Sequence, residues 1–266
     1  MTDSDRRGNA LFDGDEILYK ACRVCETETT VTGELTIHSD PAQIRRIIRQ
    51  EVQFILDETD SIEAEFAFSD PEENYRKSVY GAYKTNRVAA RKPLGYYKAR
   101  AWVEKNWHSI TWPTCEADDV MGALGEQYNI VVSSDKDMLT VPGIYYSPYH
   151  RKIRSATTRQ ANYFFLVQTL TGDATDGYPG CAKVGPVKAA RILEEFCTEP
   201  GKIRDEDMAD AWHNGVLPAY AKAKPKRDPL VQARCARILR PGEASLNHVD
   251  LWEAPPKPTV TNDEPR

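Results

Sequence analysis

The chain has 266 residues, of which 41% are hydrophobic, and a formal net charge of −5. No apolar run approaches the ~20 residues of a membrane-spanning helix, and no signal peptide is expected, so composition argues against a membrane or secreted protein. The net charge at first argues against a nucleic-acid partner, but the charges are segregated along the chain and the total decides little.

The six cysteines are scattered and predict no disulfide framework. Cys22 and Cys25 form a C-x-x-C pair, but no second pair follows at the spacing of a zinc site. We interpret them as reduced structural residues in a helical segment. Reduced cysteines favour a cytoplasmic location.

Two predicted core strands in the first third of the chain each end in an acid. A short buried strand predicted at 9–12 leads to Asp13, and the alternating segment 63–69 leads to Asp70. The other elements predicted here are a helix at 17–25, a hairpin at 27–38 around Gly33, and a helix that begins after Ser39-Asp40-Pro41.

Residues 75–105 combine positive charge with aromatic side chains. Nine basic residues face one acid, Glu104, and the block includes Arg76, Arg91 and Lys92. Five tyrosines and Trp102 are interleaved with them. Basic side chains neutralise phosphates and aromatic rings stack on bases, so this block suits nucleic acid. The alternative is a solvated basic helix with tyrosines packed beneath it.

The segment from Cys115 to Leu139 places acids at the ends of two predicted elements. Glu116, Asp118 and Asp119 open a helix predicted over 117–128. Asp135 and Asp137 follow a strand predicted over 129–133. Helix N-termini and the carboxyl ends of parallel strands are both places where charged ligands bind, so these acids could hold a divalent metal. The alternative is a solvated acidic surface.

The C-terminal third predicts a strand at 143–147, a helix at 159–170 and then a turn-rich segment. In that segment Asp173 and Asp176 lie three residues apart, on one face of a helical turn. Gly180 and Gly185 bracket a tight turn before a helix that Pro186 can open. Residues 222–240 are again basic, and the proline-rich tail from 254 is predicted to be disordered.

Nine acids therefore stand at predicted element ends, and if clustered they would repel one another strongly. Oxygen ligands without histidine favour two Mg²⁺ or Mn²⁺ ions over zinc. Such a pair, roughly 4 Å apart, can activate water against a phosphodiester. The nine acids are Asp13, Asp70, Glu116, Asp118, Asp119, Asp135, Asp137, Asp173 and Asp176.

Lys84 and Arg87 are candidate catalytic cations. They lie three residues apart on a predicted helix face, from which they could place positive charge on the scissile phosphate in the transition state. A phosphate clamp without catalytic effect is the alternative.

Several motifs in this order resemble the 5′→3′ exonuclease and flap endonuclease family, and most closely the exonucleases of T7-like podophages. The resemblance covers residues 11–252. The motifs are FDGD around Asp13, FSD at Asp70, YKTNR at 83–87, RKPLGYY at 91–97, EADDVMG at 116–122, SSDKDM at 133–138, GDATDGYPG at 172–180 and ARILR at 236–240.

The resemblance implies an α/β fold with a PIN-like, twisted, mostly parallel central sheet flanked by helices. It implies a nuclease domain over 1–170 with a basic helical arch at 71–107. A duplex-binding helix-three-turn-helix region at 171–253 and a disordered tail at 254–266 would follow.

The resemblance also implies roles for single residues. Asp13, Asp70, Glu116 and Asp118 match the tighter of two metal sites. Asp135, Asp137 and Asp176 match the second, with Asp118 near both, and Asp119 and Asp173 match outer ligands. Lys84 and Arg87 match the catalytic basic pair of the arch. Tyr83 matches a residue that stacks on a substrate base.

The expected DNA-binding residues are Tyr83, Arg76, Arg91, Lys92, Gly180, Lys183, Gly185 and Lys188. One departure concerns the duplex-binding turn, where the family's Gly-x-Gly is replaced by Lys183-Val184-Gly185. It weakens the expectation of a K⁺ ion on the carbonyl groups of this turn, and Lys183 could contact phosphate instead. Lys188 also falls one position from the expected lysine.

The implied function is a metal-dependent 5′→3′ exonuclease or flap endonuclease that acts on 5′ ends of duplex DNA. RNA in RNA–DNA hybrids is a further possible substrate. Two alternatives remain open. In a haloacid-dehalogenase-type phosphatase, Asp13 would be the nucleophile and Asp15 the acid, while a DNA-binding protein could keep the fold without catalysis.

Overall fold

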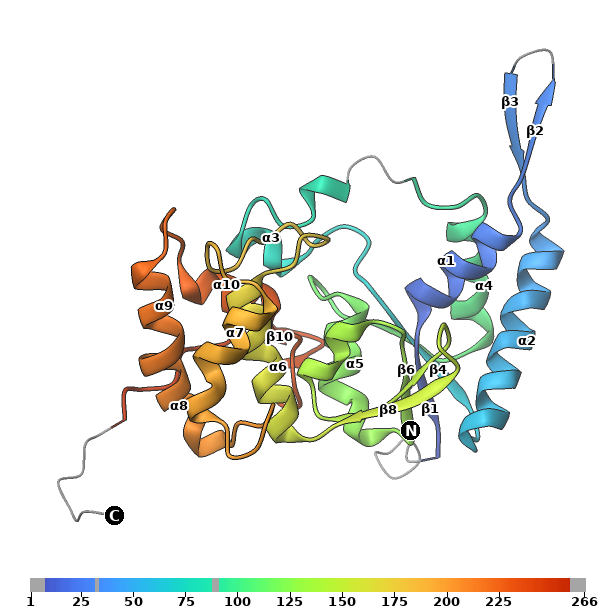
Figure 1. The fold of residues 1–266 in the computed structure, drawn as a ribbon. Coiled ribbons are helices and arrows are strands. Elements are labelled where there is room, and N and C mark those ends of the chain that lie inside the picture. Colours follow the sequence, from blue (N-terminus) through green and yellow to red (C-terminus); the bar gives the residue numbers. More distant parts are fainter. Residues whose placement is uncertain (1–7, 32–33, 88–90, 259–266) are drawn as a thin grey trace.

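The structure is a computed structural model that describes residues 8–31, 34–87 and 91–258. Its centre is a six-stranded sheet, counted over these residues, in the order β5-β4-β1-β6-β7-β8 (Figure 1). All neighbours are parallel except β7 and β8, so the prediction of a mostly parallel sheet is confirmed. The strands are β1 (Ala10–Asp13), β4 (Ala64–Phe68), β5 (Ser109–Thr111), β6 (Ile130–Val132), β7 (Gly143–Ser147) and β8 (Lys152–Ala156).

Both faces of the sheet are covered, which explains why residues 10–12 of β1 and all of β6 are apolar at every position rather than at alternate ones. Successive side chains of β1 point to opposite faces, so Phe12 joins one hydrophobic core and Leu11 another. Helices α1 (Gly14–Val24), α2 (Pro41–Thr59) and α4 (Tyr96–Asn106) pack on the Phe12 face. Helix α5 (Ala117–Leu124) packs on the Leu11 face.

The turn from β1 into α1 is tight because of two residues. Asp13 caps the helix, and its carboxylate accepts a hydrogen bond of 2.9 Å from the backbone N–H of Glu16. Gly14 lies against Phe68, whose ring would be 2.3 Å from a Cβ at this position. Asp13 is therefore held at the carboxyl end of the sheet by helix capping and by close packing.

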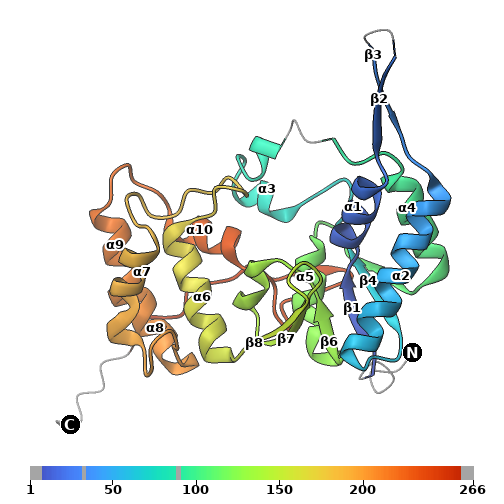
Figure 2. The ribbon, with the colours of Figure 1, turned by 45° about the vertical axis from the view of Figure 1, so that its right-hand side comes forward.

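The second predicted helix of this region is confirmed. Asp40 caps α2 and Pro41 is its first residue, as the Ser-Asp-Pro signal predicts. The predicted hairpin is present as β2 (Thr27–Val31) and β3 (Glu34–His38), which project from the body beside α2 and α4 (Figures 1 and 2). Its predicted tip, Gly33, lies outside the described residues.

The segment expected to form the arch, 71–107, contains short pieces of helix before α4. Helix α3 (Tyr75–Val79) is followed by a 3₁₀ turn at Thr85–Arg87. Lys84 precedes this turn with φ at +55°, in the left-handed region. The prediction that Lys84 and Arg87 share a helix face is therefore wrong, because Lys84 is not helical. Residues 88–90 lie outside the described residues.

Two further boundaries differ from prediction. The helix expected over 117–128 ends at Leu124 and tightens into a 3₁₀ turn at Gly125–Gln127. After β6, a second 3₁₀ turn at Lys136–Thr140 begins at Asp135, whose side chain caps it. In contrast, the predicted strand at 143–147 is present as β7.

The C-terminal part is helical and has its own hydrophobic core, in which Phe165, Trp212 and Trp252 meet. Helix α6, predicted at 159–170, packs against α7 and α10 (Figure 1). The elements are α6 (Thr158–Thr171), α7 (Pro186–Leu193), α8 (Met208–Asp210), a π-helical turn (Ala211–Val216), α9 (Leu217–Lys222), α10 (Pro229–Ala236), β9 (Ala244–Ser245), β10 (His248–Val249) and 3₁₀ turns at Glu194–Phe196 and Asp205–Asp207.

The prediction of disorder from residue 254 onward is wrong for the first residues of the tail. Ala254 packs on the C-terminal core, and the carbonyl of Pro255 accepts a hydrogen bond of 2.9 Å from His213. Residues 259–266 lie outside the described residues. None of the helices within the described part of the chain combines the length and apolar character that a membrane crossing requires.

Candidate active site

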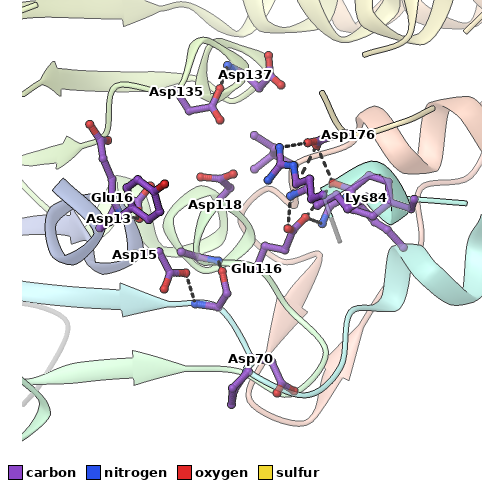
Figure 3. A pocket seen from close by; sticks show the side chains of 18 of the residues that line it. Asp13, Asp15, Glu16, Asp70, Lys84, Glu116, Asp118, Asp135, Asp137 and Asp176 are labelled. Carbon is purple, nitrogen blue, oxygen red and sulfur yellow. Dashed lines mark hydrogen bonds and ion pairs between the residues drawn. The ribbon is translucent and has the colours of Figure 1, made fainter. Parts of the chain in front are cut away.

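The candidate site lies where the chain changes direction in the sheet. From β1 the chain proceeds through β4 to β5 on one side, and then from β6 to β8 on the other. Ligands of open α/β sheets bind in the crevice at such a point, outside the carboxyl ends of the strands. A cavity of about 630 Å³ opens here (Figure 3). Among the residues that line it are Asp13, Asp70, Tyr83, Lys84, Arg87, Glu116, Asp118, Asp135, Asp137 and Asp176.

Asp13 and Asp118 are the two cavity carboxyl groups with the most strongly raised pKa values, and Asp118 lies between Asp13 and Glu116 in Figure 3. Burial raises the pKa of Asp13 well above its usual range, and the neighbouring carboxylate of Asp15 raises it further. Burial likewise raises the pKa of Asp118, together with the negative charge of Asp135. Carboxyl groups with such pKa values are poorly compensated by the chain, so the region attracts a cation.

Glu116 has the opposite electrostatic environment. Burial alone would raise its pKa, but the positive charges of Lys84 and Arg76 outweigh that effect and lower it to about 2. Lys84 forms an ion pair with one carboxylate oxygen of Glu116. The other oxygen accepts hydrogen bonds from Tyr83 Oη at 2.9 Å and from Arg76 Nη1 at 3.2 Å.

Tyr83 and Lys84 also contact Asp176, an acid that belongs to the C-terminal part of the chain. Its carboxylate accepts from Tyr83 Oη at 2.8 Å, pairs with Arg87, and lies 3.7 Å from Lys84 Nζ. The backbone N–H of Lys84 also donates to the carbonyl of Asp176 at 2.7 Å. Lys84 therefore connects acids from two regions of the chain across the cavity, and Arg87 adds a second cation beside Asp176.

Tyr83 does not occupy the position expected for a residue that stacks on a base. Its side chain is buried, with 2% exposure, and it packs against Tyr178 in the C-terminal core. Its hydroxyl donates to Glu116 and Asp176, as described above. The expectation of stacking on a substrate base is wrong for this conformation, because no ring face is free.

Asp135 and Asp137 face the cavity, while Asp173 does not. Burial and the charge of Asp135 raise the pKa of Asp137 to about 6. Lys136 bridges Asp137 and Asp173 with two contacts of 2.9 Å. The other oxygen of Asp173 accepts from the N–H of Thr175 at 2.6 Å. The expected outer-ligand role of Asp173 is therefore not supported, because the turn and Lys136 occupy both of its oxygens.

Asp70 lines the cavity but lies apart from the other acids (Figure 3). Its carboxylate accepts from the backbone N–H groups of Glu72 at 2.9 Å and Thr114 at 2.7 Å, and these donors lower its pKa. Asp15 lies nearer to the cluster, where it accepts hydrogen bonds from the hydroxyl of Tyr96 and from Ser69 N at 3.0 Å.

Asp15 and Glu16 are cavity carboxylates that sequence reasoning missed as metal ligands, and Asp15 was considered only for the phosphatase alternative. The FDGD motif contains a usable signal, because Asp15 falls in the first turn of the helix that Asp13 caps. In the set expected to surround the first metal, the structure therefore favours Asp15 over Asp70 as the acid nearer to Asp13.

Asp119 and Arg76 form a buried ion pair, which contradicts the role expected for each of them. Asp119 is fully buried, and its oxygens accept from Arg76 Nη1 at 2.6 Å and Nη2 at 2.7 Å. Arg76 is 2% exposed and donates further to the carbonyl groups of Cys235 and Arg237. The expected roles of Asp119 as an outer metal ligand and of Arg76 in DNA contact are wrong for this conformation, because both side chains are buried and bonded to partners within the core.

Arg91 and Lys92, the other two expected DNA-binding residues of the basic block, are on the surface. Arg91 is exposed and pairs with Glu26 at 2.6 Å, at the base of the β2–β3 hairpin. Lys92 lines the cavity, with its ammonium group 4.2 Å from the centre of the Tyr96 ring.

The turn at 180–185 divides into a buried and an exposed part. Gly180 is buried at φ +59°, and a Cβ on it would lie 2.2 Å from the backbone nitrogen of Gly172. Its expected role in DNA binding is wrong, because it permits two backbone segments to pack closely. Lys183, Gly185 and Lys188 are exposed, and the two lysines line a second cavity of about 590 Å³ with Arg191, Lys222 and Lys224.

The donor chemistry of the main cavity suits a hard divalent cation, although the side chains are not gathered around one point. Carboxylate oxygens predominate, and histidine is absent from the described residues that line the cavity. Within the described ranges, no three His, Cys, Asp or Glu side chains lie close enough together to hold a metal ion. Glu116 and Asp176 are instead paired with Lys84 and Arg87, so a bound ion would have to replace these contacts.

Comparisons with known proteins agree with this geometry. The chain is 28% identical to the exonuclease of Escherichia phage T7, over 93% of this chain and 94% of the relative. It is equally similar to the exodeoxyribonuclease of Enterobacteria phage T3, over 93% of each. Its fold matches that of the bacteriophage T5 flap endonuclease in a pseudo-enzyme–product complex with DNA and metal ions. The TM-score is 0.57 and the identity 17%, over 86% of this chain and 84% of that chain.

A family model describes the N-terminal part of the chain. It is the 5′-3′ exonuclease, N-terminal resolvase-like domain, and it matches residues 9–161, which include β1 to β8 and all the cavity acids except Asp176. The chain therefore belongs to the 5′-3′ exonuclease family.

Proposed function

We propose that this protein hydrolyses phosphodiester bonds from the 5′ ends of duplex DNA, as a 5′→3′ exonuclease with flap endonuclease capacity. The observation that carries the proposal is the single cavity at the carboxyl edge of the sheet. Acids from β1, α5 and the segment after β6 meet there with Lys84 and Arg87. The similarity to the phage exonucleases over nearly the whole chain supports the same activity.

The acids fit a divalent cation by charge and donor type, and we infer dependence on two Mg²⁺ or Mn²⁺ ions. Asp13, Asp15, Glu116 and Asp118 would hold one, and Asp135, Asp137 and Asp176 the other; Asp70 becomes available only if its turn opens. Bound ions of this kind lower the pKa of water and neutralise charge on phosphate oxygens. The T5 relative, whose structure contains metal ions and DNA, is consistent with this proposal.

Lys84 and Arg87 would orient and stabilise the phosphate. Both side chains point into the cavity, and the backbone hydrogen bond from Lys84 to Asp176 fixes where the Lys84 side chain begins. The ion pairs with Glu116 and Asp176 keep the two cations at this place. When these acids are neutralised, the same cations can face the charge that develops on the phosphate.

The C-terminal surface would bind the duplex backbone. Lys183, Lys188, Arg191, Lys222 and Lys224 surround one exposed cavity, and such a group of cations attracts phosphates without reading sequence. Duplex DNA is the proposed partner, and an RNA–DNA hybrid would present a similar backbone. We do not propose a K⁺ site at the turn, because Lys183 stands where the family has glycine.

Digestion of 5′-labelled and 3′-labelled duplexes in parallel tests the proposal. The protein should release short labelled products from the 5′-labelled strand in Mg²⁺ or Mn²⁺, with and without a flap, and none in chelator. A 3′-labelled strand should shorten progressively. Hydrolysis of small phosphomonoesters alone would favour the phosphatase, and binding without any release would favour the non-catalytic protein.

The role of Lys84 has its own test. In single-turnover digestion, Lys84→Ala should slow the chemical step by about 10²-fold, because a preorganised charge at the phosphate is lost. Duplex affinity measured in chelator should fall less. Lys152→Ala, which removes an exposed lysine from β8, is the matched control. A loss confined to affinity would leave Lys84 as a phosphate clamp.

A further inference from the structure

The central sheet ends at β8, whose outer side has no neighbouring strand among the described residues. Backbone groups on such a side can pair with a strand from elsewhere. Ile153 of β8 lies opposite Tyr146 of β7, so it shares a face of the sheet with Ile144, two residues before Tyr146. Tyr146 is buried, but Ile144 and Ile153 are 53% and 59% exposed. We call Ile144 together with residues 151–155 the β8 edge.

The β8 edge is positively charged. Residues 147–156 contain Arg151, Lys152 and Arg154 and no acid. Arg151 pairs with Glu51 at 3.1 Å, and Arg154 donates to a backbone carbonyl group after β6, while Lys152 is exposed. A lysine on an edge strand opposes the pairing of two identical edges, because like charges would then lie close together. The β8 edge is therefore a poor partner for a second β8 and a good partner for an acidic strand.

The β2–β3 hairpin has the opposite charge. Residues 26–44 include four acids and neither lysine nor arginine. The hairpin projects from the body beside α2 and α4, so its strands are accessible to a second molecule (Figures 1 and 2). The four acids are Glu26, Glu28, Glu34 and Asp40.

The hairpin also lacks the packing that such an element needs. Leu35 lies opposite Thr30 and Ile37 lies opposite Glu28, so the two apolar side chains share one face. Leu35 is 62% exposed, and among the described residues β2 and β3 pair only with each other. A two-stranded hairpin is marginally stable in water unless a third strand or a packed face supports it. Docking on a further sheet would supply both.

We propose that the β2–β3 hairpin of one copy of this protein docks on the β8 edge of a second copy and extends its sheet. Strand addition pairs the free backbone groups of both edges and brings the acids of the hairpin to Lys152. It also covers Ile144 and Ile153, which a nucleic-acid backbone would leave exposed. The inference goes beyond the proposed function, because the contact needs neither DNA nor metal.

The contact joins two different surfaces of the same chain. When it is reciprocal it closes into a pair, and otherwise it continues into longer assemblies. Both outcomes depend on the same two surfaces. In dilute digestion and duplex-binding assays the contact is dissociated, so it does not enter the cleavage and affinity measurements.

Sedimentation velocity over a series of protein concentrations, without DNA or metal, tests the proposal. The unaltered protein should self-associate, and rising salt should weaken the association because the paired charges are exposed. Lys152→Glu should weaken it by at least about tenfold, and the double variant Glu28→Lys, Glu34→Lys should do the same. Lys105→Glu, which reverses an exposed charge on α4, is the matched control and should leave the association unchanged.

A mixture of the two altered proteins separates loss of the contact from misfolding. The Lys152→Glu variant keeps an intact hairpin, and the double variant keeps an intact β8 edge. An equimolar mixture should therefore associate although neither protein does so alone. A protein that stays monomeric at every concentration, or an association that neither charge reversal changes, would overturn the proposal. A loss of duplex affinity in Lys152→Glu with self-association retained would also overturn it, and would make the β8 edge a DNA contact.

Discussion

The carboxylate cavity and the C-terminal basic surface use charge in opposite ways. In the cavity, Asp13 is buried and Asp118 half-buried, and both have pKa values raised well above their usual range. On the C-terminal surface, Lys183 and Lys188 are exposed, while apolar residues such as Trp212 form the core beneath. The first arrangement creates a strong local demand for a cation. The second supplies long-range attraction for a polyanion at little cost in folding free energy.

The difference teaches that reactivity and affinity can be placed in separate parts of one chain. Charges that react must be desolvated and held, so the cavity relies on long-range contacts such as Tyr83 to Glu116 and Asp176. Charges that only attract can remain solvated. Substitutions in the two regions should therefore affect different measured quantities.

The largest effect is expected from Asp135→Asn. It removes one charge from the acids that surround Asp118, so cleavage should fall by at least about 10³-fold, while duplex binding in chelator is retained. Single-turnover digestion and anisotropy measure the two quantities. Asp57→Asn, on the exposed face of α2, is the matched control. Unaltered cleavage by Asp135→Asn would refute the role given to this acid.

Arg76→Ala should have the largest effect on stability. It leaves Asp119 buried without its partner and removes a donor from Glu116, so the free energy of unfolding should fall by about 3–5 kcal/mol. Urea titration monitored by circular dichroism measures it. Arg204→Ala breaks a solvent-exposed pair with Asp207 and should cost far less. Similar losses of unfolding free energy in both variants would show that the buried Arg76–Asp119 pair contributes no more to stability than the pair at Arg204.

A smaller effect, with a defined pH dependence, is expected from Asp137→Asn. Because the pKa of Asp137 is raised from 3.8 to about 6, the folded state binds this proton more tightly than the unfolded state does. Its ionisation therefore lowers stability progressively as pH rises through about 4 to 6. In chelator, Asp137→Asn should be more stable than the unaltered protein at pH 8 by on the order of 2 kcal/mol, with little difference at pH 4. Equal differences at both pH values would contradict this.

The smallest effect is expected from Lys183→Ala or Lys188→Ala. Each should weaken duplex binding a few-fold and reduce the slope of log affinity against log salt by roughly one. The cleavage rate at saturating DNA should change less than the affinity. Lys152→Ala provides the surface-lysine control. A large loss of rate at saturation would mean that this surface is coupled to the chemistry.

The sequence was sufficient for the parts of the fold that local chemistry specifies. Alternation and apolar runs located β1 and β4, and the Ser-Asp-Pro signal located the start of α2. Acids at strand ends also indicated which residues would share an edge of the sheet, because a parallel sheet gathers the carboxyl ends of its strands. Helix ends and the segment at 84–87 were less predictable, because tertiary contacts such as Lys84 N–H to Asp176 override local propensity.

The sequence by itself determined the family and which acids are candidates for the site, because the FDGD, EADD and DKD motifs and their order can be read directly from the chain. Only the tertiary structure decided how each acid is used. Asp119 and Asp15 are equally acidic in the printed chain, yet Arg76 reaches Asp119 from 43 residues away and neutralises it, whereas Asp15 remains beside Asp13. The physical reason is that solvation and ion pairing depend on neighbours in space, and the pattern of residues along a chain does not contain them.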